Sequence, residues 1–130
     1  MPSVLKRVSD SSDLLSRLGP VRLLRMDIDP TDPSSGDYKL RVTLSGDLRL
    51  DVYERLVGGR VVKYSYSLIR GEGVLLRYDN APHHRDLETH PHHRHVRGRV
   101  LPLYDHSLSA FLQEVTEFLK GIDSGSSEGE

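Results

Sequence analysis

Residues 38–53, YKLRVTLSGDLRLDVY, predict the fold of this chain more clearly than any other stretch. Apolar and polar side chains alternate from Tyr38 to Leu44 and again from Leu48 to Tyr53, which is the period of a half-buried β-strand. Between the two runs, Ser45-Gly46-Asp47 is typical of a tight turn. The stretch therefore predicts a β-hairpin with one apolar face and one polar face.

Further strands are expected on both sides of this hairpin. The apolar run Val21–Asp29 precedes it, and two more runs, Val61–Ile69 and Val74–Asp79, follow it. Glycine-containing turns separate these last two runs from what comes before them, at Gly58-Gly59 and at Arg70–Gly73. The sequence thus predicts about five strands in succession.

The register across the Gly58-Gly59 turn has two alternatives. A two-residue loop would pair Glu54 with Lys63, whereas one extra loop residue would pair Val52 with Tyr64. The second alternative matches the apolar faces better, so we expect it.

A helix is expected near each end of the chain. Leu14, Leu15 and Leu18 have helical spacing after the candidate caps at residues 9–11, and Gly19-Pro20 would end that helix. An apolar stripe predicts a second helix from about Ser107 to Lys120, formed by Leu108, Phe111, Leu112, Val115, Phe118 and Leu119.

Together these elements predict the fold class α+β. We expect a single domain over residues 1–120, with one antiparallel meander sheet of about five strands. The N-terminal and the C-terminal helix would pack on one face of this sheet, because an apolar sheet face and an apolar helix stripe each need a partner. Residues 121–130, GIDSGSSEGE, predict a disordered acidic Gly/Ser tail.

Composition indicates a soluble protein of the cytoplasm. The chain has no cysteine, which excludes disulfides, thiol chemistry and cysteine zinc sites. No apolar run approaches the roughly 20 residues that span a bilayer, and no apolar run follows the basic N-terminus as in a secretion signal. The net charge is −1. Because the tail carries Asp123, Glu128 and Glu130 and no basic residue, the rest of the chain is net basic, which permits contact with nucleic acid.

The chemistry is concentrated in Arg77–His95, RYDNAPHHRDLETHPHHRH. Six of the seven histidines lie between His83 and His95, and residues 80–99 have no usable hydrophobic periodicity. This composition is typical of a functional loop at the end of a strand.

Three interpretations of the histidines compete. Metal ligation needs neutral imidazoles that converge, and the interspersed arginines would oppose a dication. Acid–base cleavage of RNA needs a base, an acid and cations around the phosphate, which histidine and arginine supply together. A polar surface that only docks a partner would need no chemistry. The joint presence of histidine and arginine favours RNA cleavage.

Several stretches carry a resemblance to a known family. Residues 63–68 (KYSYSL), Arg77–Pro82 (RYDNAP), His83-His84 and Thr89–His95 (THPHHRH) resemble the TumE family, the toxin half of a type II toxin–antitoxin pair. The resemblance implies a small cytoplasmic toxin, ribonuclease-like, that is neutralised by a cognate DNA-binding antitoxin. We accordingly expect RNA as substrate, no cofactor and no membrane partner. Whether the chain forms a homodimer stays open.

The resulting function hypothesis is a metal-independent endoribonuclease toxin. A histidine-rich metal-binding protein and a non-enzymatic partner-binding module are the alternatives. His83 or His84 would act as base or acid, with His93 or His95 in the opposite role. The candidate catalytic residues are His83, His84, His93, His95 and Asp79. The candidate substrate-binding residues are Arg77, Arg85, Arg94, Tyr64, Tyr66 and Lys63, and no metal ligand is assigned.

Overall fold

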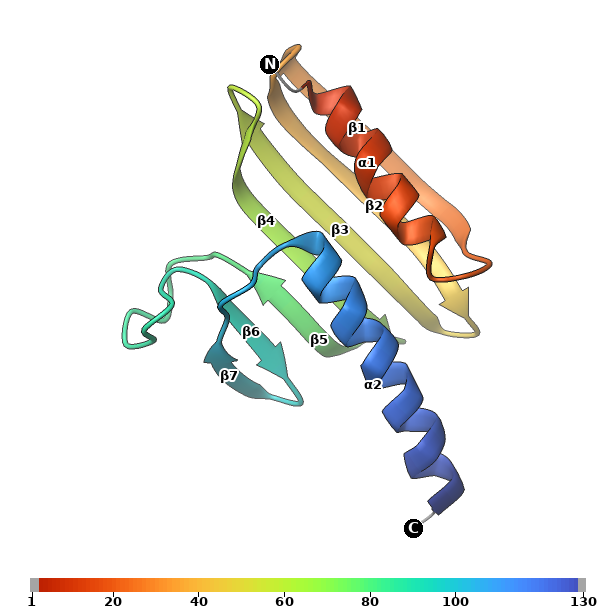
Figure 1. Ribbon diagram of the computed structural model, residues 1–130. Helices are drawn as coiled ribbons and strands as arrows, with labels where there is room; N and C mark the ends of the chain where they lie inside the picture. Colours follow the sequence, from red (N-terminus) through yellow and green to blue (C-terminus); the bar gives the residue numbers. More distant parts are fainter. Residues whose placement is uncertain (1–2, 129–130) are drawn as a thin grey trace.

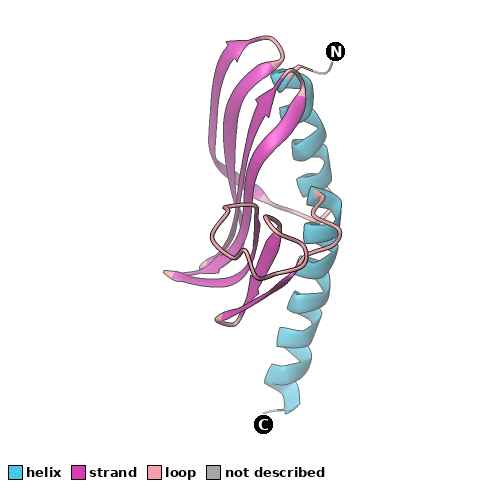
Figure 2. Cartoon of the chain, turned by 90° about the vertical axis from the view of Figure 1, so that its left-hand side faces the viewer, coloured by secondary structure: helices cyan, strands magenta, loops and turns pink. Residues whose placement is uncertain are grey.

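A computed structural model describes residues 3–128 and contains one sheet with two helices on one of its faces (Figures 1 and 2). The elements follow one another as α1 (Val4–Ser16), β1 (Arg22–Asp32), β2 (Ser35–Ser45), β3 (Leu48–Val57), β4 (Arg60–Arg70), β5 (Gly73–Asp79), β6 (His93–Val96), β7 (Arg99–Pro102) and α2 (Leu108–Glu128). The α+β class, the antiparallel meander and the two terminal helices are as predicted.

The strand count differs from the prediction. Seven strands follow one another across the sheet in chain order, instead of about five. Of the two additional strands, β6 lies within residues 80–99, which the sequence predicted as a loop, and β7 begins at the last residue of that segment. The side chains of β6 are too polar to show a hydrophobic period, and β7 spans only four residues, so pattern alone could not separate these strands from the loop.

The β2–β3 hairpin forms as the alternation predicted. Leu40 lies opposite Val52 and Val42 opposite Leu50, and all four side chains are buried. The turn at Gly46 has a φ of 55°, a conformation that glycine adopts without a steric cost.

The predicted register between β3 and β4 is wrong. The Gly58-Gly59 turn is a two-residue loop, and an irregularity after the pair Leu56 and Val61 then shifts the register by one residue. This shift places Val52 opposite Tyr66. A bulge of this kind restores the match of apolar faces without a longer loop.

Both helices differ from the prediction at one end. α1 begins at Val4, earlier than expected, because Ser3 caps it by accepting a hydrogen bond from the Lys6 backbone N–H at 3.0 Å. α2 begins where it was expected, after Ser107, which accepts a hydrogen bond from the Ala110 N–H, but it continues to Glu128 instead of ending at Lys120. The tail predicted for residues 121–130 therefore starts within α2. Its predicted disorder stays a prediction, and residues 129–130 lie outside the described residues.

The core between sheet and helices contains one buried carboxylate. Glu54 on β3 is fully buried and accepts two hydrogen bonds at 2.6 Å from Arg7 of α1. The hydroxyl groups of Tyr38 and Tyr66 donate to the same carboxylate. Burial and the charge of Glu54 raise the pKa of both tyrosines, so both remain donors. This network links α1 to three strands.

Candidate functional site

The candidate site lies where β5 and β6 pair. Arg77 lies opposite His95, and Asp79 lies opposite His93. Residues directly opposite each other in an antiparallel pair point to the same face, so these four side chains share one face of the sheet. Tyr78, between Arg77 and Asp79, points the other way and packs against α2. The four side chains therefore occupy the face that the helices leave uncovered.

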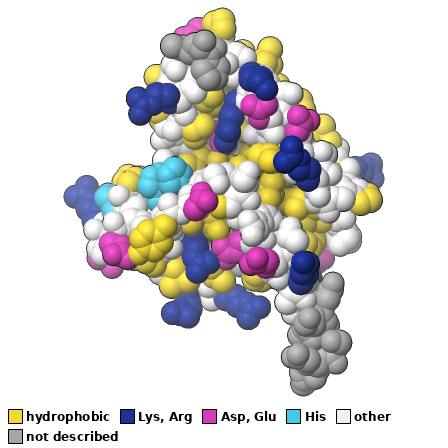
Figure 3. All heavy atoms as spheres, viewed as in Figure 1, with side chains coloured by type: hydrophobic (Ala, Val, Ile, Leu, Met, Phe, Trp, Pro, Cys, Tyr) yellow, Lys and Arg dark blue, Asp and Glu magenta, His cyan; other side chains and the backbone are white. Residues whose placement is uncertain are grey.

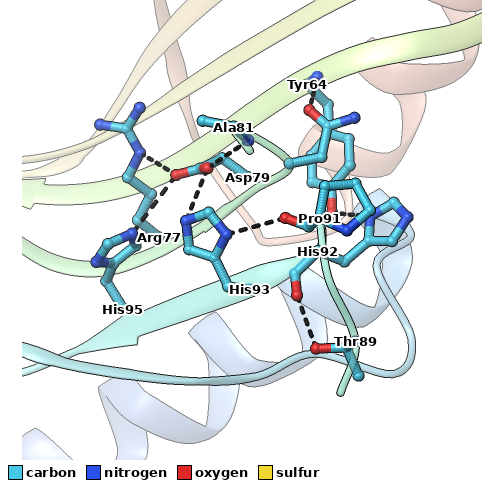
Figure 4. Close-up of polar contacts among 10 residues, drawn as sticks. Tyr64, Arg77, Asp79, Ala81, Thr89, Pro91, His92, His93 and His95 are labelled. Carbon is cyan, nitrogen blue, oxygen red and sulfur yellow. Dashed lines mark hydrogen bonds and ion pairs between the residues drawn. The ribbon is translucent and has the colours of Figure 1, made fainter. Parts of the chain in front are cut away.

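Asp79 is the centre of the polar contacts (Figure 4). Its carboxylate is buried, with an exposed fraction of 4%. Oδ1 lies 2.9 Å from His93 Nε2 and accepts a hydrogen bond from the Ala81 backbone N–H at 3.0 Å. Oδ2 accepts from Arg77 Nε at 2.9 Å and lies 3.6 Å from His95 Nε2. One carboxylate thus positions an arginine and one imidazole, and a second imidazole lies beside it.

His93 has both ring nitrogens engaged. Nε2 faces Asp79, and Nδ1 lies 3.0 Å from the carbonyl oxygen of Pro91. Both of these oxygens are acceptors, so only a ring with hydrogen on both nitrogens satisfies the two contacts. The side chain is also buried, with an exposed fraction of 2%. His93 therefore positions its neighbours and has no free nitrogen to accept a proton.

His84 and His95 complete a cluster of three imidazoles. The His84 ring stands edge-on to the rings of His93 and His95, with centroids 4.7 and 5.9 Å away. Burial lowers the pKa of His95, and the nearby positive groups His93 and Arg77 lower it further, whereas Asp79 raises it. The net direction is downward, which favours the neutral form of His95 at neutral pH.

A cavity of about 420 Å³ opens over this cluster. His83 and His84 line it from the loop after β5, and His93 and His95 line it from β6. The other lining residues are Val74, Arg77, Asp79, Ala81, Arg97 and Gly98. Two guanidinium groups and several imidazoles share this cavity with a single carboxylate, so it suits an anion such as a phosphodiester.

Two hydrogen-bonding side chains hold the loop that carries His83 and His84. The Asn80 side chain donates to the Val62 carbonyl oxygen at 3.0 Å and accepts from the Tyr64 N–H at 3.1 Å. Thr89 Oγ1 donates to the His92 carbonyl oxygen at 2.7 Å. The first end of the loop is thereby fixed to β4, and the second end is fixed to the residue before β6.

Three predicted substrate-binding residues lie on the helix-covered face, away from this cavity. Arg94 donates to Glu114 of α2 at 2.6 Å. Tyr66 is buried in the core, with its hydroxyl on Glu54. Tyr64 is also buried, and burial raises its pKa. None of the three can reach an anion in the cavity.

Two further predicted residues are exposed outside the cavity lining. They are Lys63 at the exposed end of β4 and Arg85 in the loop after β5.

Sequence reasoning missed Arg97, which lines the cavity from the β6–β7 turn. Arg97 and Gly98 both have positive φ, of 50° and 80°, as a two-residue hairpin turn requires. The Arg97-Gly98 pair was the sequence signal for this turn. The residues around it are mostly polar, so the flanking segments were not recognised as strands.

A second group of imidazoles lies on the opposite face. The rings of His92 and His106 are stacked 3.8 Å apart and parallel, and the Tyr64 hydroxyl lies 2.8 Å from His92 Nδ1. Figure 3 shows histidine side chains reaching the surface on this face. His106 therefore has a packing role, separate from the cavity.

A metal ion would have one place to bind among the described residues. His84, His93 and His95 each offer a ring nitrogen, and these nitrogens lie within 4.8 Å of one another. To serve as a ligand, His93 would have to give up Asp79 or Pro91, and the neighbouring arginines would repel a dication. The arrangement fits an anion better than a metal.

Comparison with known proteins places the chain in a family. In the part of the chain that the structure describes, no helix combines the length and apolar character needed to cross a bilayer. No curated protein and no solved structure matches the sequence. A family model described as toxin TumE matches residues 12–119, which include the whole sheet and the cavity. The chain therefore belongs to the TumE family of toxins.

Proposed function

We propose that this chain is the toxin of a type II toxin–antitoxin pair and that it cleaves RNA in the cytoplasm without a metal ion. Its membership in a toxin family implies an antitoxin partner, which we propose to be a DNA-binding protein. The observation that supports RNA cleavage most directly is the convergence of imidazoles and guanidinium groups in one cavity around the buried Asp79.

In the proposed reaction His95 is the base. It removes the proton from a ribose 2′-hydroxyl, and O2′ then attacks the adjacent phosphorus while the bond from phosphorus to O5′ breaks. His84 is the acid that gives a proton to the leaving O5′. The products are a 2′,3′-cyclic phosphate and a free 5′-hydroxyl, so no water or metal enters the step.

The remaining groups of the cavity bind the phosphate and orient the reacting side chains. Arg77 and Arg97 hold the phosphate and neutralise the charge that develops on its oxygens. His93 keeps Asp79 in place, and Asp79 orients Arg77 next to His95. We assign His83 as a further hydrogen-bond donor to the phosphate, because it is exposed and lines the cavity.

The test is cleavage of single-stranded RNA by the purified full-length protein in EDTA. We expect His84→Ala and His95→Ala to lose about 100-fold or more of the cleavage rate, the usual contribution of an acid or base. The matched control is His90→Ala, since His90 is exposed in the same loop but does not line the cavity. Undiminished cleavage in both cavity variants would refute the assignment.

The same measurement separates the alternatives. The three-histidine cluster is the observation in favour of a metal-binding protein. Cleavage that is lost in EDTA, together with stoichiometric zinc in protein purified without chelator, would select that alternative. A protein with no cleavage, no bound metal and a tight complex with the antitoxin would be a partner-binding module.

The pH dependence tests which histidine is the base. A base must be neutral to act, so the rate rises with pH as the base loses its proton. Because the pKa of His95 is lowered from 6.5, we expect the acidic limb of kcat/KM to lie below pH 6.5. The measurement is kcat/KM for a short fluorogenic RNA as a function of pH, from below pH 6.5 to above it. A rate that still rises steeply above that pH would contradict the role of His95.

A further inference from the structure

β1 is an edge strand whose outer side has no partner among residues 3–128 (Figure 1). It spans 11 residues, whereas the strand at the other edge, β7, spans four. An unpaired edge of this length presents a row of free backbone N–H and C=O groups that another strand can pair with. Every residue of β1 is exposed except Ile28, which is partly buried.

The helix-side face of β1 is apolar but uncovered. Leu23 lies opposite Val42 and Met26 lies opposite Leu40, so both point to the side of the sheet that carries the core. Val42 and Leu40 are buried there, yet Leu23 is 52% exposed and Met26 is 44% exposed. The apolar face of the sheet therefore extends beyond the area that the helices cover and continues onto the edge strand β1.

The other face of β1 carries opposite charges two residues apart. Arg25 and Asp27 are both more than half exposed and contact each other within the strand. Arg25 lies opposite Arg41 on β2, which already binds Asp51 in bidentate fashion, at 2.8 and 3.0 Å. Arg25 thus lies next to a like charge and lacks a partner on the neighbouring strand.

We propose that two copies of this chain join through β1, antiparallel about a two-fold axis at Met26. The two sheets then become one continuous sheet, and the exposed Met26 side chains of the two copies meet on its helix side. This inference concerns assembly and does not depend on the proposed RNA cleavage. The cavity is lined from β5, the loop after it, β6 and the β6–β7 turn, at the opposite end of each sheet, and stays open.

Charge complementarity selects this register. With the axis at Met26, Arg25 of each copy lies opposite Asp27 of the other, which gives two attractive pairs. An axis at Arg25 or at Asp27 would instead place that residue opposite its own copy, with like charges in contact. β1 pairs regularly with β2 from Arg25 to Pro30, so this central part is straight enough to accept a strand. Pro30, which has no N–H, limits pairing beyond it.

Sedimentation velocity of the purified full-length chain tests the proposal. We expect a concentration-dependent dimer for the wild type. Arg25→Asp would place acidic residues opposite each other at two positions, and Asp27→Arg would do the same with basic ones. Each should weaken dimerisation on the order of tenfold or more in Kd. Arg70→Asp is the matched control, because Arg70 is an exposed arginine facing Asp47, away from β1.

Complementation makes the test specific. A mixture of the Arg25→Asp and Asp27→Arg chains should form a heterodimer, and the double variant R25D/D27R should dimerise like the wild type, because both arrangements restore opposite charges. Heterodimer formation in the mixture also shows that both single variants fold. A monomeric wild type, or single variants that dimerise unchanged, would overturn the proposal.

Discussion

Replacing Asp79 by asparagine is expected to lower RNA cleavage by up to about 10⁴-fold, the loss seen when the orienting carboxylate of a catalytic histidine is made an amide. Asparagine keeps the size of the side chain but removes the charge. The buried oxygens of Asp79 now serve Arg77, His93 and the Ala81 N–H at once. An amide offers one oxygen instead of two, so at least one of these groups loses its acceptor.

The effect should exceed that of removing a single histidine. Arg77 takes its position from Asp79, the ring of His95 lies beside the same carboxylate, and His93 would face a donor NH₂ group or lose its contact. The half-exposed Arg77 and the buried His93 would then lose their shared acceptor, which costs stability as well as activity. The proposed phosphate ligand would be displaced, and the proposed base would lose the carboxylate beside it.

The measurement is the single-turnover cleavage rate, with the folded fraction determined by circular dichroism on the same samples. Glu114→Gln is the matched control, because Glu114 holds Arg94 in the equivalent way on the other face of the sheet. The control should cleave normally. An Asp79→Asn protein that is folded and cleaves within about threefold of the wild type would contradict the central role of Asp79.

The sheet could be predicted from sequence where one face is apolar and the other polar. Within the two strands between Tyr38 and Tyr53, every second side chain faces the core, so apolar and polar residues alternate with a period of two. β6 has the same geometry but not the same signal. His93 and His95 face the cavity and Arg94 faces α2, and all three residues are polar. A strand that is polar on both faces cannot be distinguished from a loop by hydrophobicity.

The candidate site was predicted in composition but not in arrangement. The density of histidine and arginine after Tyr78 pointed to the segment that lines the cavity. Which side chains come together depends on structural features that a short stretch of sequence does not reveal. One is the pairing of β6 with β5, which selects His93 and His95 and turns Arg94 away. Another is the turn that returns Arg97 to the cavity.

The second large effect is expected on stability, from Arg7→Met. Glu54 is fully buried, and Arg7 is its cationic partner across 47 residues of sequence. Removing one partner of a buried ion pair leaves an uncompensated charge in the core, which typically costs about 3–5 kcal/mol. We expect a loss of this size in the free energy of unfolding from urea titration. The hydroxyl groups of Tyr38 and Tyr66 still donate to Glu54, but they carry no charge.

Two further variants identify the buried charge as the cause. Lys6→Met removes the neighbouring cation on α1. Because the ion pair of Lys6 with Asp10 is exposed, this variant should leave the urea midpoint unchanged. The double variant R7M/E54Q should be more stable than Arg7→Met alone, because the neutral glutamine keeps an acceptor for a tyrosine hydroxyl without a charge. If Arg7→Met were no worse than Lys6→Met, the Glu54 network would not hold α1 on the sheet. Sequence hinted at this network only through an acidic residue at a position of β3 that faces the core, and a charge so placed is stable only when the fold brings a cation to it.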